Sequence, residues 1–321
     1  MNQQLIDLKN MLAPIADLIQ DKNDVFYLDY PLHLNVGDLL IYHGTEQFFT
    51  DHNIRVTLKR SEFDVDIEEL KQKITPNTTI LLHGGGNFGD LYPQHQKIRE
   101  TVVQTFPNNR VIVLPQTLFY KSQETLEKSA ALFAQHSDCH LLARDERTAK
   151  TFEQFSPNVY LSPDMAHELY GTLPTKKTQS GNALYFLRKD IEASDIEKNI
   201  TAQLPVGSHI KDWEDMLSER DDLVLAATWR LAKFAKRHQL TGLKNSVHRF
   251  WKAYTKRIIK RVAKTFLSYD NITTTRLHGH IFSCLLEIPN MVCDNSYGKN
   301  TGYANLWTKP LDFVEFYTQQ K

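Results

Sequence analysis

The sequence predicts an α/β protein with two Rossmann-like domains. From residue 25 to residue 161, short apolar strands alternate with helical patterns, which is typical of a parallel sheet with helices on both faces. The chain has 321 residues, which suits two domains of about 150 residues each. The segment 171–182 (GTLPTKKTQSGN) is polar and contains Gly and Pro, so it is the best linker candidate. We therefore expect an N-terminal domain at 1–170 and a C-terminal α/β domain at 183–321.

The expected elements follow one another along the chain. An amphipathic helix is expected at 1–20. First-domain strands are expected at 25–28, 54–58, 79–82, 110–114, 140–143 and 159–161, with helices beginning near residues 39, 67, 94, 123 and 146. The second domain is less regular, with strands expected at 183–187, 272–275 and 291–293, a helical insertion at about 223–269, and a final helix near the C-terminus.

Composition places the chain among ordinary globular proteins. It is 41% hydrophobic and 24% charged, so it can bury a core. The formal net charge is zero, so no overall field attracts nucleic acid, and we expect no such partner. Cys139, Cys284 and Cys293 lack metal-ligand spacing and are expected to be reduced core thiols; we expect no metal site. Without a secretory pattern or an apolar run long enough to span a bilayer, the expected location is cytoplasmic.

One junction has the composition of an anion site. The strand expected at 272–275 runs directly into Arg276, Leu277, His278, Gly279 and His280, and an apolar helix comes next. In open α/β sheets, ligands bind at the carboxyl ends of strands, where N–H groups of the next helix favour anions. Arginine offers a planar clamp, and histidine exchanges protons near neutral pH. The alternative is that the arginine pairs with a carboxylate while the histidines cap the helix or fill the core.

A glycine-rich loop follows an apolar strand at 81–90 (LLHGGGNFGD). Successive glycines let the backbone approach a ligand and direct amide N–H groups at it. The loop is neither a Walker motif nor the dinucleotide fingerprint in its usual context. We expect it to cradle substrate, with Asn87 and Asp90 orienting sugar hydroxyls or phosphate. A merely flexible turn is the alternative.

A second polar loop, HLNVGD at 33–38, follows the first expected strand and opens a helix. Asn35 or Asp38 in this loop could cap the helix or contact substrate. Further polar segments stand at later strand ends: LLARDERTA at 141–149, SPDMA at 162–166, and LRKDIE at 187–192. In LLARDERTA and SPDMA, a structural ion pair between Arg144 and Asp164 is the favoured interpretation.

In this order and spacing, these segments together resemble the polysaccharide pyruvyl transferase family. The resemblance spans about residues 30–305 and includes the glycine loop near Lys299 (IPNMVCDNSYGKNTGY). It implies a fold like that of type-B glycosyltransferases. It also implies transfer of an enolpyruvyl-derived group from phosphoenolpyruvate to a sugar, usually as a cyclic ketal, with no cofactor beyond that donor.

The expected roles of the site residues combine this resemblance with the chemistry of the strand ends. Arg188 and Arg276 are expected to converge on the phosphate and carboxylate of phosphoenolpyruvate. His278 is the candidate general acid, Asp38 and Asp90 are nearly equal candidates for the base, and His280 is expected to pack or to support His278. The other expected substrate contacts are Leu277, Asn35, Gly85, Gly86, Asn87 and Lys299.

The insertion is strongly basic. From residue 223 to residue 269 there are twelve Lys and Arg but no Asp or Glu. Apolar residues recur at three and four positions along 247–266, which predicts one helical stripe. An interfacial helix at about 244–267 on an anionic membrane is the favoured interpretation, and a core-packed helix with a solvated basic face is the alternative. Nucleic-acid binding is a weaker interpretation, since no recognised motif accompanies the charge.

Membrane attachment would suit the acceptor that the resemblance implies, a sugar or lipid-linked oligosaccharide. Two other functions stay open at the level of sequence. One is a type-B glycosyltransferase that uses a nucleotide sugar. The other is a non-catalytic, membrane-associated assembly protein.

Overall fold

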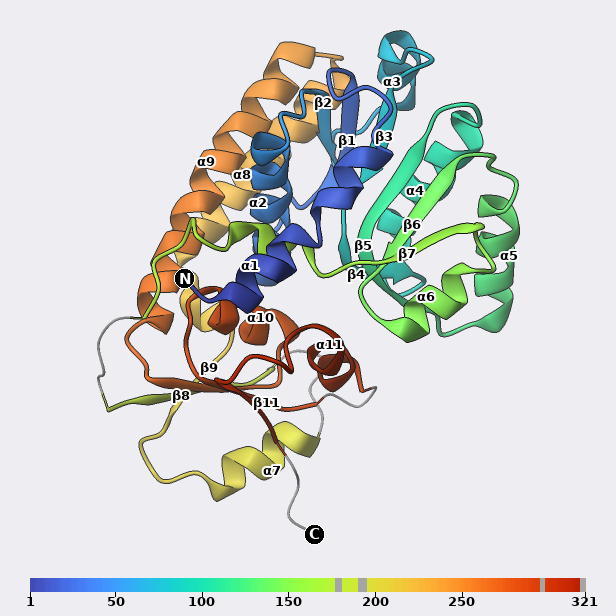
Figure 1. Ribbon diagram of the computed structural model, residues 1–321. Coiled ribbons are helices and arrows are strands. Elements are labelled where there is room, and N and C mark those ends of the chain that lie inside the picture. The colour runs from blue at the N-terminus through green and yellow to red at the C-terminus, as the bar shows by residue number, and fades with distance from the viewer. Residues whose placement is uncertain (177–180, 190–194, 295–297, 318–321) are drawn as a thin grey trace.

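The computed structural model describes residues 1–176, 181–189, 195–294 and 298–317. Its first sheet has seven parallel strands in the order β2-β1-β3-β5-β6-β7, with β4 paired to β5 (Figure 1). The strands are β1 Val25–Tyr30, β2 Val56–Ser61, β3 Thr79–Leu82, β4 Gly85–Gly89, β5 Val111–Phe119, β6 Cys139–Ala143 and β7 Asn158–Leu161. Strands β1, β3 and β6 are buried at every residue, as expected for strands covered on both faces.

Helices alternate with these strands along the chain. They are α1 Gln3–Asn10, α2 Val36–Asp51, α3 Ile67–Lys73, α4 Pro93–Thr105, α5 Gln123–Phe133 and α6 Glu146–Phe152, with 3-10 turns at Ala13–Leu18 and Met165–Leu169. Several of these helices begin at an N-cap residue whose side chain accepts a hydrogen bond from a backbone N–H group of the first turn. These residues are Asn35 for α2, Asp66 for α3, Ser122 for α5 and Asp145 for α6.

The second sheet has five parallel strands in the order β12-β11-β10-β8-β9. They are β8 Ala183–Phe186, β9 His209–Lys211, β10 Asn271–Thr274, β11 Asn290–Val292 and β12 Val314–Phe316. Helices α7 Asp195–Gln203, α10 Leu277–Leu285 and α11 Lys299–Trp307 accompany them, with a short 3-10 turn at Glu214–Met216. Parallel sheets covered by helices are the α/β class that the sequence predicts.

The basic insertion folds into two long helices, α8 Glu219–Arg237 and α9 Thr241–Phe266. In sequence they separate β9 from β10 of the second sheet. In space α9 packs against α2 and β2 of the first lobe, the half of the molecule that contains the first sheet; the second lobe contains the second sheet (Figure 1). The indole N–H of Trp251 donates to the carbonyl of Pro31 at 2.7 Å. The insertion therefore ties the second half of the chain to the first sheet.

Most of the apolar stripe of α9 packs on the protein core, as in the core-packed alternative, so the membrane contact predicted for 244–267 could involve only the outer face of the helix. Val247, Trp251, Ile258, Val262 and Phe266 are each at most 4% exposed and belong to the protein core. A helix that lies on a protein core and a helix that lies on lipid have the same three-and-four periodicity, so the pattern alone could not separate them. The residues between the stripe positions still form a basic outer face.

Two further differences from the predicted elements concern ends and loops. The glycine-rich segment contains strand β4, which extends the first sheet beside β5. The expected C-terminal helix is instead strand β12, at the edge of the second sheet. The described part of the expected linker contains neither helix nor strand, and its residues 177–180 lie outside the described residues. A single apolar cluster contains residues beside both sheets, so the lobes share a core.

Candidate functional site

A cavity of about 480 Å³ lies where the carboxyl ends of strands from both sheets meet. Its volume is in the range of small-molecule sites. The segments that line it follow β1, β2, β6, β8, β9 and β10 or lie in and directly after β4, and α2, α4 and α10 begin beside it. The lining residues are His33, Asn35, Asp38, Glu62, Gly86, Asn87, Leu91, Tyr92, Pro93, Gln94, His95, Arg144, Arg188, Trp213, Arg276, Leu277 and His278.

The cavity brings together most of the residues that sequence reasoning selected. Arg188 and Arg276 follow neighbouring strands β8 and β10, which pair in parallel, so both arginines come from one edge of the second sheet. Arg276 donates from Nε to Asp212 at 2.8 Å, and its Nη2 also donates to that carboxylate. Asp212 is 2% exposed. The arginine therefore both pairs with a carboxylate and lines the cavity, which combines the two interpretations of its motif.

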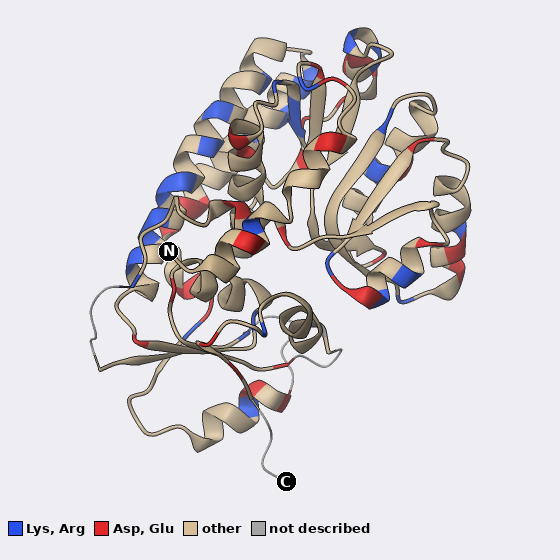
Figure 2. Ribbon diagram, in the orientation of Figure 1, with Lys and Arg blue, Asp and Glu red and all other residues tan. Residues whose placement is uncertain are grey.

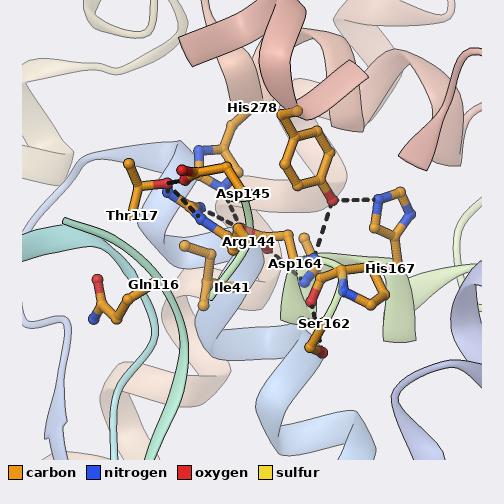
Figure 3. A network of polar contacts seen from close by, with 12 residues as sticks. Ile41, Gln116, Thr117, Arg144, Asp145, Ser162, Asp164, His167 and His278 are labelled. Atoms are coloured by element: carbon orange, nitrogen blue, oxygen red, sulfur yellow. Dashed lines mark hydrogen bonds and ion pairs between the residues drawn. The ribbon is translucent and has the colours of Figure 1, made fainter. Parts of the chain in front are cut away.

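His278 lies in the first turn of α10 and faces the first lobe. Its Nε2 is 3.4 Å from Oδ2 of Asp164, which Arg144 also contacts through Nη1 (Figure 3). Burial alone would raise the pKa of Asp164, but Arg144 and His278 outweigh it and hold that pKa well below its usual range. The expected pair of Arg144 and Asp164 is confirmed, and Arg144 also lines the cavity.

Gly37 explains how His278 can lie so close to the first lobe. An ideal Cβ on Gly37 would lie 2.9 Å from Nδ1 of His278 and 3.0 Å from its Cβ. Any larger residue at position 37 would therefore push the imidazole away from the N-terminus of α2. The glycine of the HLNVGD segment is thus required by close packing across the lobes.

Asp38 and the glycine loop form the opposite wall. Gly85 has a φ of 125°, which disfavours other residues, and an ideal Cβ there would lie 3.7 Å from Oδ1 of Asp38. Oδ2 of Asp38 is 3.6 Å from Nε2 of His33. Asn35 caps α2 by accepting from the amide of Gly37 at 3.0 Å. Asp38 therefore lines the cavity between the start of α2 and the glycine loop.

Asn87 also lines the cavity, but its side-chain oxygen is already engaged. Nη2 of Arg99 donates to it at 2.5 Å, and Nε2 of Gln116 donates at 3.1 Å. These contacts hold the glycine loop against α4 and β5. A structural role in shaping the loop is therefore established for the oxygen of Asn87.

Other expected residues lie elsewhere. The catalytic role expected for Asp90 does not fit its position, because its carboxylate accepts from the amides of Lys121 and Ser122 and is not part of the cavity lining. His280 is fully buried, donates to Asn290 at 2.6 Å, and has its pKa lowered to about 4 by burial. Lys299 begins α11, and its side chain lies outside the described part of the structure.

Sequence reasoning missed a carboxylate–histidine cluster formed by Asp29, His95 and Glu62. Nδ1 of His95 donates to Oδ1 of Asp29 at 2.7 Å, and its Nε2 lies 3.7 Å from Oε2 of Glu62. Asp29 has a φ of 66°, a strained conformation for a non-glycine residue that is common at functional sites. The available signal was the position of His95, in the first turn of the helix that follows the glycine loop.

In this cluster the pKa values of His95 and Glu62 are both raised, for different reasons. Burial lowers the pKa of His95, but the adjacent Asp29 outweighs it, so the pKa is raised overall. Burial raises the pKa of Glu62. The cavity therefore contains a histidine that favours its protonated form and a carboxyl group whose ionised form is disfavoured.

Metal binding and membrane crossing are two further features that the structure bears on. Within the described ranges, no group of three or more His, Cys, Asp and Glu is placed to hold a metal ion. Over the same ranges, we find no helix of the length and hydrophobicity that crossing a membrane requires. The three cysteines are buried and unpaired, as the sequence predicts.

Known proteins resemble this chain over most of its length. The family model described as polysaccharide pyruvyl transferase matches residues 35–297. The chain is 37% identical to the Bacillus subtilis protein named "Putative pyruvyl transferase EpsO", over 94% of this chain and 91% of that one. It is 29% identical to pyruvyl transferase 1 of Schizosaccharomyces pombe, over 88% and 69% of the two chains.

A solved structure supports the fold. A functionally uncharacterised protein of Klebsiella pneumoniae superposes with a TM-score of 0.57 at 18% identity, covering 96% of this chain and 99% of that one. The family match includes the HLNVGD segment from Asn35 onward, the glycine loop and the Arg276–His278 junction, which are the segments that meet at the cavity. The chain therefore belongs to the polysaccharide pyruvyl transferase family.

Proposed function

We propose that the protein transfers the pyruvyl group of phosphoenolpyruvate to a sugar of a surface polysaccharide precursor, forming a cyclic ketal. The observation that carries the proposal is that Arg144, Arg188, Arg276 and His278 line one cavity at the N-terminus of α10. Phosphoenolpyruvate carries a carboxylate and a phosphate close together. Guanidinium groups bind both anions with fixed geometry, and the first N–H groups of a helix favour negative charge.

The partners of these cations support a preorganised donor site. Asp212 engages the Nε and Nη2 edge of Arg276 and thereby fixes the plane of its guanidinium. Asp164 likewise fixes Arg144. His95, whose pKa is raised by Asp29, supplies a further positive group at the cavity wall. We infer an arrangement like that of type-B glycosyltransferases, in which the donor binds at the second lobe and faces the glycine loop of the first.

The chemistry needs one proton donor and one proton acceptor. A proton goes to the methylene carbon of phosphoenolpyruvate, a sugar hydroxyl attacks C2, phosphate leaves, and a second hydroxyl closes the ketal. We infer that His278 delivers the proton and that Asp164 positions its ring. Asp38 is the candidate base, because it lies on the cavity wall beside the glycine loop. The net reaction converts donor and diol to ketal and inorganic phosphate.

A second cavity, of about 790 Å³, adjoins the first through Glu62 and Gln94. We infer that the acceptor, a sugar or lipid-linked oligosaccharide, reaches the donor from this side. Its wall combines apolar and basic side chains, which suits a ligand that has both anionic and apolar parts. The other residues lining it are Phe63, Val65, Asp66, Ile67, Lys97, Ile98, Thr101, Lys233, Lys236 and Arg237.

A coupled assay tests the proposal. The protein is incubated with phosphoenolpyruvate and a panel of oligosaccharide acceptors, and released phosphate and product mass are both followed. We expect phosphate release that depends on the acceptor, with a product heavier by pyruvate less one water. An enolpyruvyl ether without ring closure has the same mass as the ketal, so proton NMR of the product is needed to distinguish the ketal methyl signal from the vinyl signals of the ether. Vinyl signals would revise the product, and phosphate release without any acceptor would contradict transfer.

A thermal-shift panel separates this function from a nucleotide-sugar transferase on the same fold. Because a ligand that binds only the native state raises the melting temperature, we expect phosphoenolpyruvate to stabilise the protein more than UDP- or GDP-sugars do. The reverse ranking would favour the glycosyltransferase. We place the reaction in the cytoplasm.

A further inference from the structure

Helix α8 presents a strip of apolar side chains to solvent. Leu223, Leu231 and Phe234 are 71%, 48% and 51% exposed. With the exposed Ala227, they recur at intervals of four, four and three residues, so they lie along one side of the helix. The buried residues of α8 form a separate strip, so the exposed one does not serve the protein core.

Helix α9 continues this surface. The ring of Phe250, which is 52% exposed, stacks on Tyr254 with centroids 5.9 Å apart. The hydroxyl of Tyr254 donates to Asp221 of α8 at 2.7 Å, and Arg261 pairs with the same carboxylate at 2.6 Å. These contacts align the two helices side by side. Phe250 is exposed on α9 beside the contact between Tyr254 and Asp221, and the apolar strip of α8 is exposed on the neighbouring helix.

The surface is flanked by positive charge that the protein does not balance. Figure 2 shows a basic band along α9, within the 223–269 segment that has twelve Lys and Arg and no acidic residue. Lys256, Arg257, Lys260 and Lys264 are exposed, and none has an acidic partner within ion-pair distance among the residues that the structure describes. An apolar strip beside uncompensated basic residues is characteristic of helices that lie at a lipid interface.

We propose that the outer face of the α8–α9 hairpin binds an anionic lipid surface. Leu231, Phe234 and Phe250 would enter the interfacial layer, while the basic residues of α9 contact the headgroups. Pairing two copies of this face would bring two positive surfaces together, so charge complementarity favours lipid as the occupant. The face is distinct from the buried stripe of α9, and its binding does not depend on the reaction that the protein performs.

The position of the hairpin gives such binding a consequence for substrate access. Lys233, Lys236 and Arg237 of α8 line the second cavity, which adjoins the catalytic cavity through Glu62 and Gln94. A protein held to a membrane through α8 would therefore keep one wall of its access route close to the headgroups. An acceptor attached to lipid could then reach the site without leaving the membrane.

Vesicle cosedimentation tests the proposal with the full chain. We expect the protein to bind phosphatidylcholine–phosphatidylglycerol vesicles, to bind phosphatidylcholine vesicles much less, and to lose binding as salt rises. The double variant Leu231→Glu/Phe234→Glu and the triple variant Lys256→Glu/Lys260→Glu/Lys264→Glu should each weaken binding to anionic vesicles at least about tenfold.

Matched controls use exposed residues far from the hairpin. Tyr160→Glu/Leu161→Glu changes two side chains that are 38% and 46% exposed, and Lys121→Glu/Lys128→Glu/Lys150→Glu changes net charge as much as the α9 variant does. Both controls should bind vesicles like the unmodified protein, apart from a weak effect of net charge.

Several results would overturn the proposal. They are equal binding to neutral and anionic vesicles, unchanged binding by both hairpin variants, or equal loss in the control variants. A change of oligomeric state on size-exclusion chromatography with light scattering, without a change in vesicle binding, would instead assign the face to a protein contact. Circular dichroism checks folding, and Leu231→Gln/Phe234→Gln replaces the glutamate pair if that pair does not fold.

Discussion

Two clusters of buried charge, one beneath α9 and one at the cavity, differ in their surroundings. Beneath α9, Glu46 accepts from Lys59 at 2.6 Å and from Lys252, and lies 3.3 Å from His248. This cluster joins α2, β2 and α9. At the cavity, the pairs Arg144–Asp164 and Arg276–Asp212 are also buried, but both arginines line the cavity.

A perturbed pKa does not separate the two clusters. Burial would raise the pKa of Glu46, but His248 and Lys59 outweigh it and hold it well below its usual range. Asp164 shows the same direction for the same kind of reason. Both shifts arise from buried ion pairing, which occurs in structural networks as well as in active sites. The distinguishing feature is therefore the adjacent cavity, where cations can meet a ligand.

The largest expected effect of breaking this distinction is at His278. His278→Gln should lower kcat for pyruvyl transfer by about 10²–10⁴-fold while leaving folding intact, because it removes the proposed general acid. Initial-rate assays and thermal melts would measure both properties.

His280→Gln is the matched control on the same helix. It should leave kcat per folded molecule unchanged but cost about 1–3 kcal/mol of stability, because His280 is buried between Asn290 and Thr308. Equal losses of kcat in the two variants would contradict the assignment.

The next effect compares an arginine at the cavity with a buried arginine away from it. Arg276→Lys should lower kcat/KM for phosphoenolpyruvate about 10²-fold, because lysine cannot reproduce a planar, bidentate contact. Arg60→Lys is the matched change in a separate buried ion pair away from the cavity, where Arg60 is fully buried and donates to Glu69. It should lower the melting temperature with kcat/KM unchanged. If Arg60→Lys impaired donor binding as much as Arg276→Lys, the cavity would not be the donor site.

A smaller effect is expected at Glu46. Glu46→Gln should destabilise the protein by about 1–3 kcal/mol without changing turnover, because two lysines lose their buried partner. Since the pKa of Glu46 is depressed on folding, its contribution is present above the unfolded pKa and disappears as the pH falls through the folded pKa. Urea unfolding at neutral and acidic pH should therefore show a difference that shrinks in acid. Glu124→Gln, in the exposed pair with Lys128, should have almost no effect.

The range of each interaction determines which parts of the molecule the sequence could predict. Strand positions and the junction at Arg276–His278 depend on local apolar runs and on the polar residues directly after them, so they could be predicted. The candidate cavity contains residues from 33 to 278, and it was anticipated because parallel strands place their carboxyl ends at one edge. Partners such as Asp212 lie 64 residues from Arg276, and no local pattern indicates them.

The same reasoning explains why Asp90 and the apolar stripe of α9 do not lie where we expected them. Asp90 follows the glycine loop, so it had the expected position for a base, but its oxygens are used by the amides of Lys121 and Ser122. The stripe of α9 had the right periodicity for lipid, but most of it packs on the protein core, where Phe266 contacts Phe186 of the second lobe. In both instances, the deciding contact comes from a part of the chain distant in sequence.

The smallest expected effect concerns the missed cluster around His95. A pH titration of donor binding tests whether that cluster contributes to the candidate cavity. Asp29 raises the pKa of His95, so the protonated form is favoured in the folded protein; this contribution is present at low pH and lost as the pH rises through the raised pKa.

If protonated His95 helps to bind the donor, affinity for phosphoenolpyruvate should fall over that alkaline range. In Asp29→Asn, burial dominates and lowers the pKa of His95, so the fall should begin at a lower pH than in the unmodified protein. Donor titrations followed by tryptophan fluorescence across pH would measure it, since Trp213 lines the cavity. Asp138→Asn, which removes the partner of His140 outside the cavity, should leave the profile unchanged. An identical shift in both variants would place His95 with the structural charges, because only a group that meets the ligand can transfer its own titration to donor affinity.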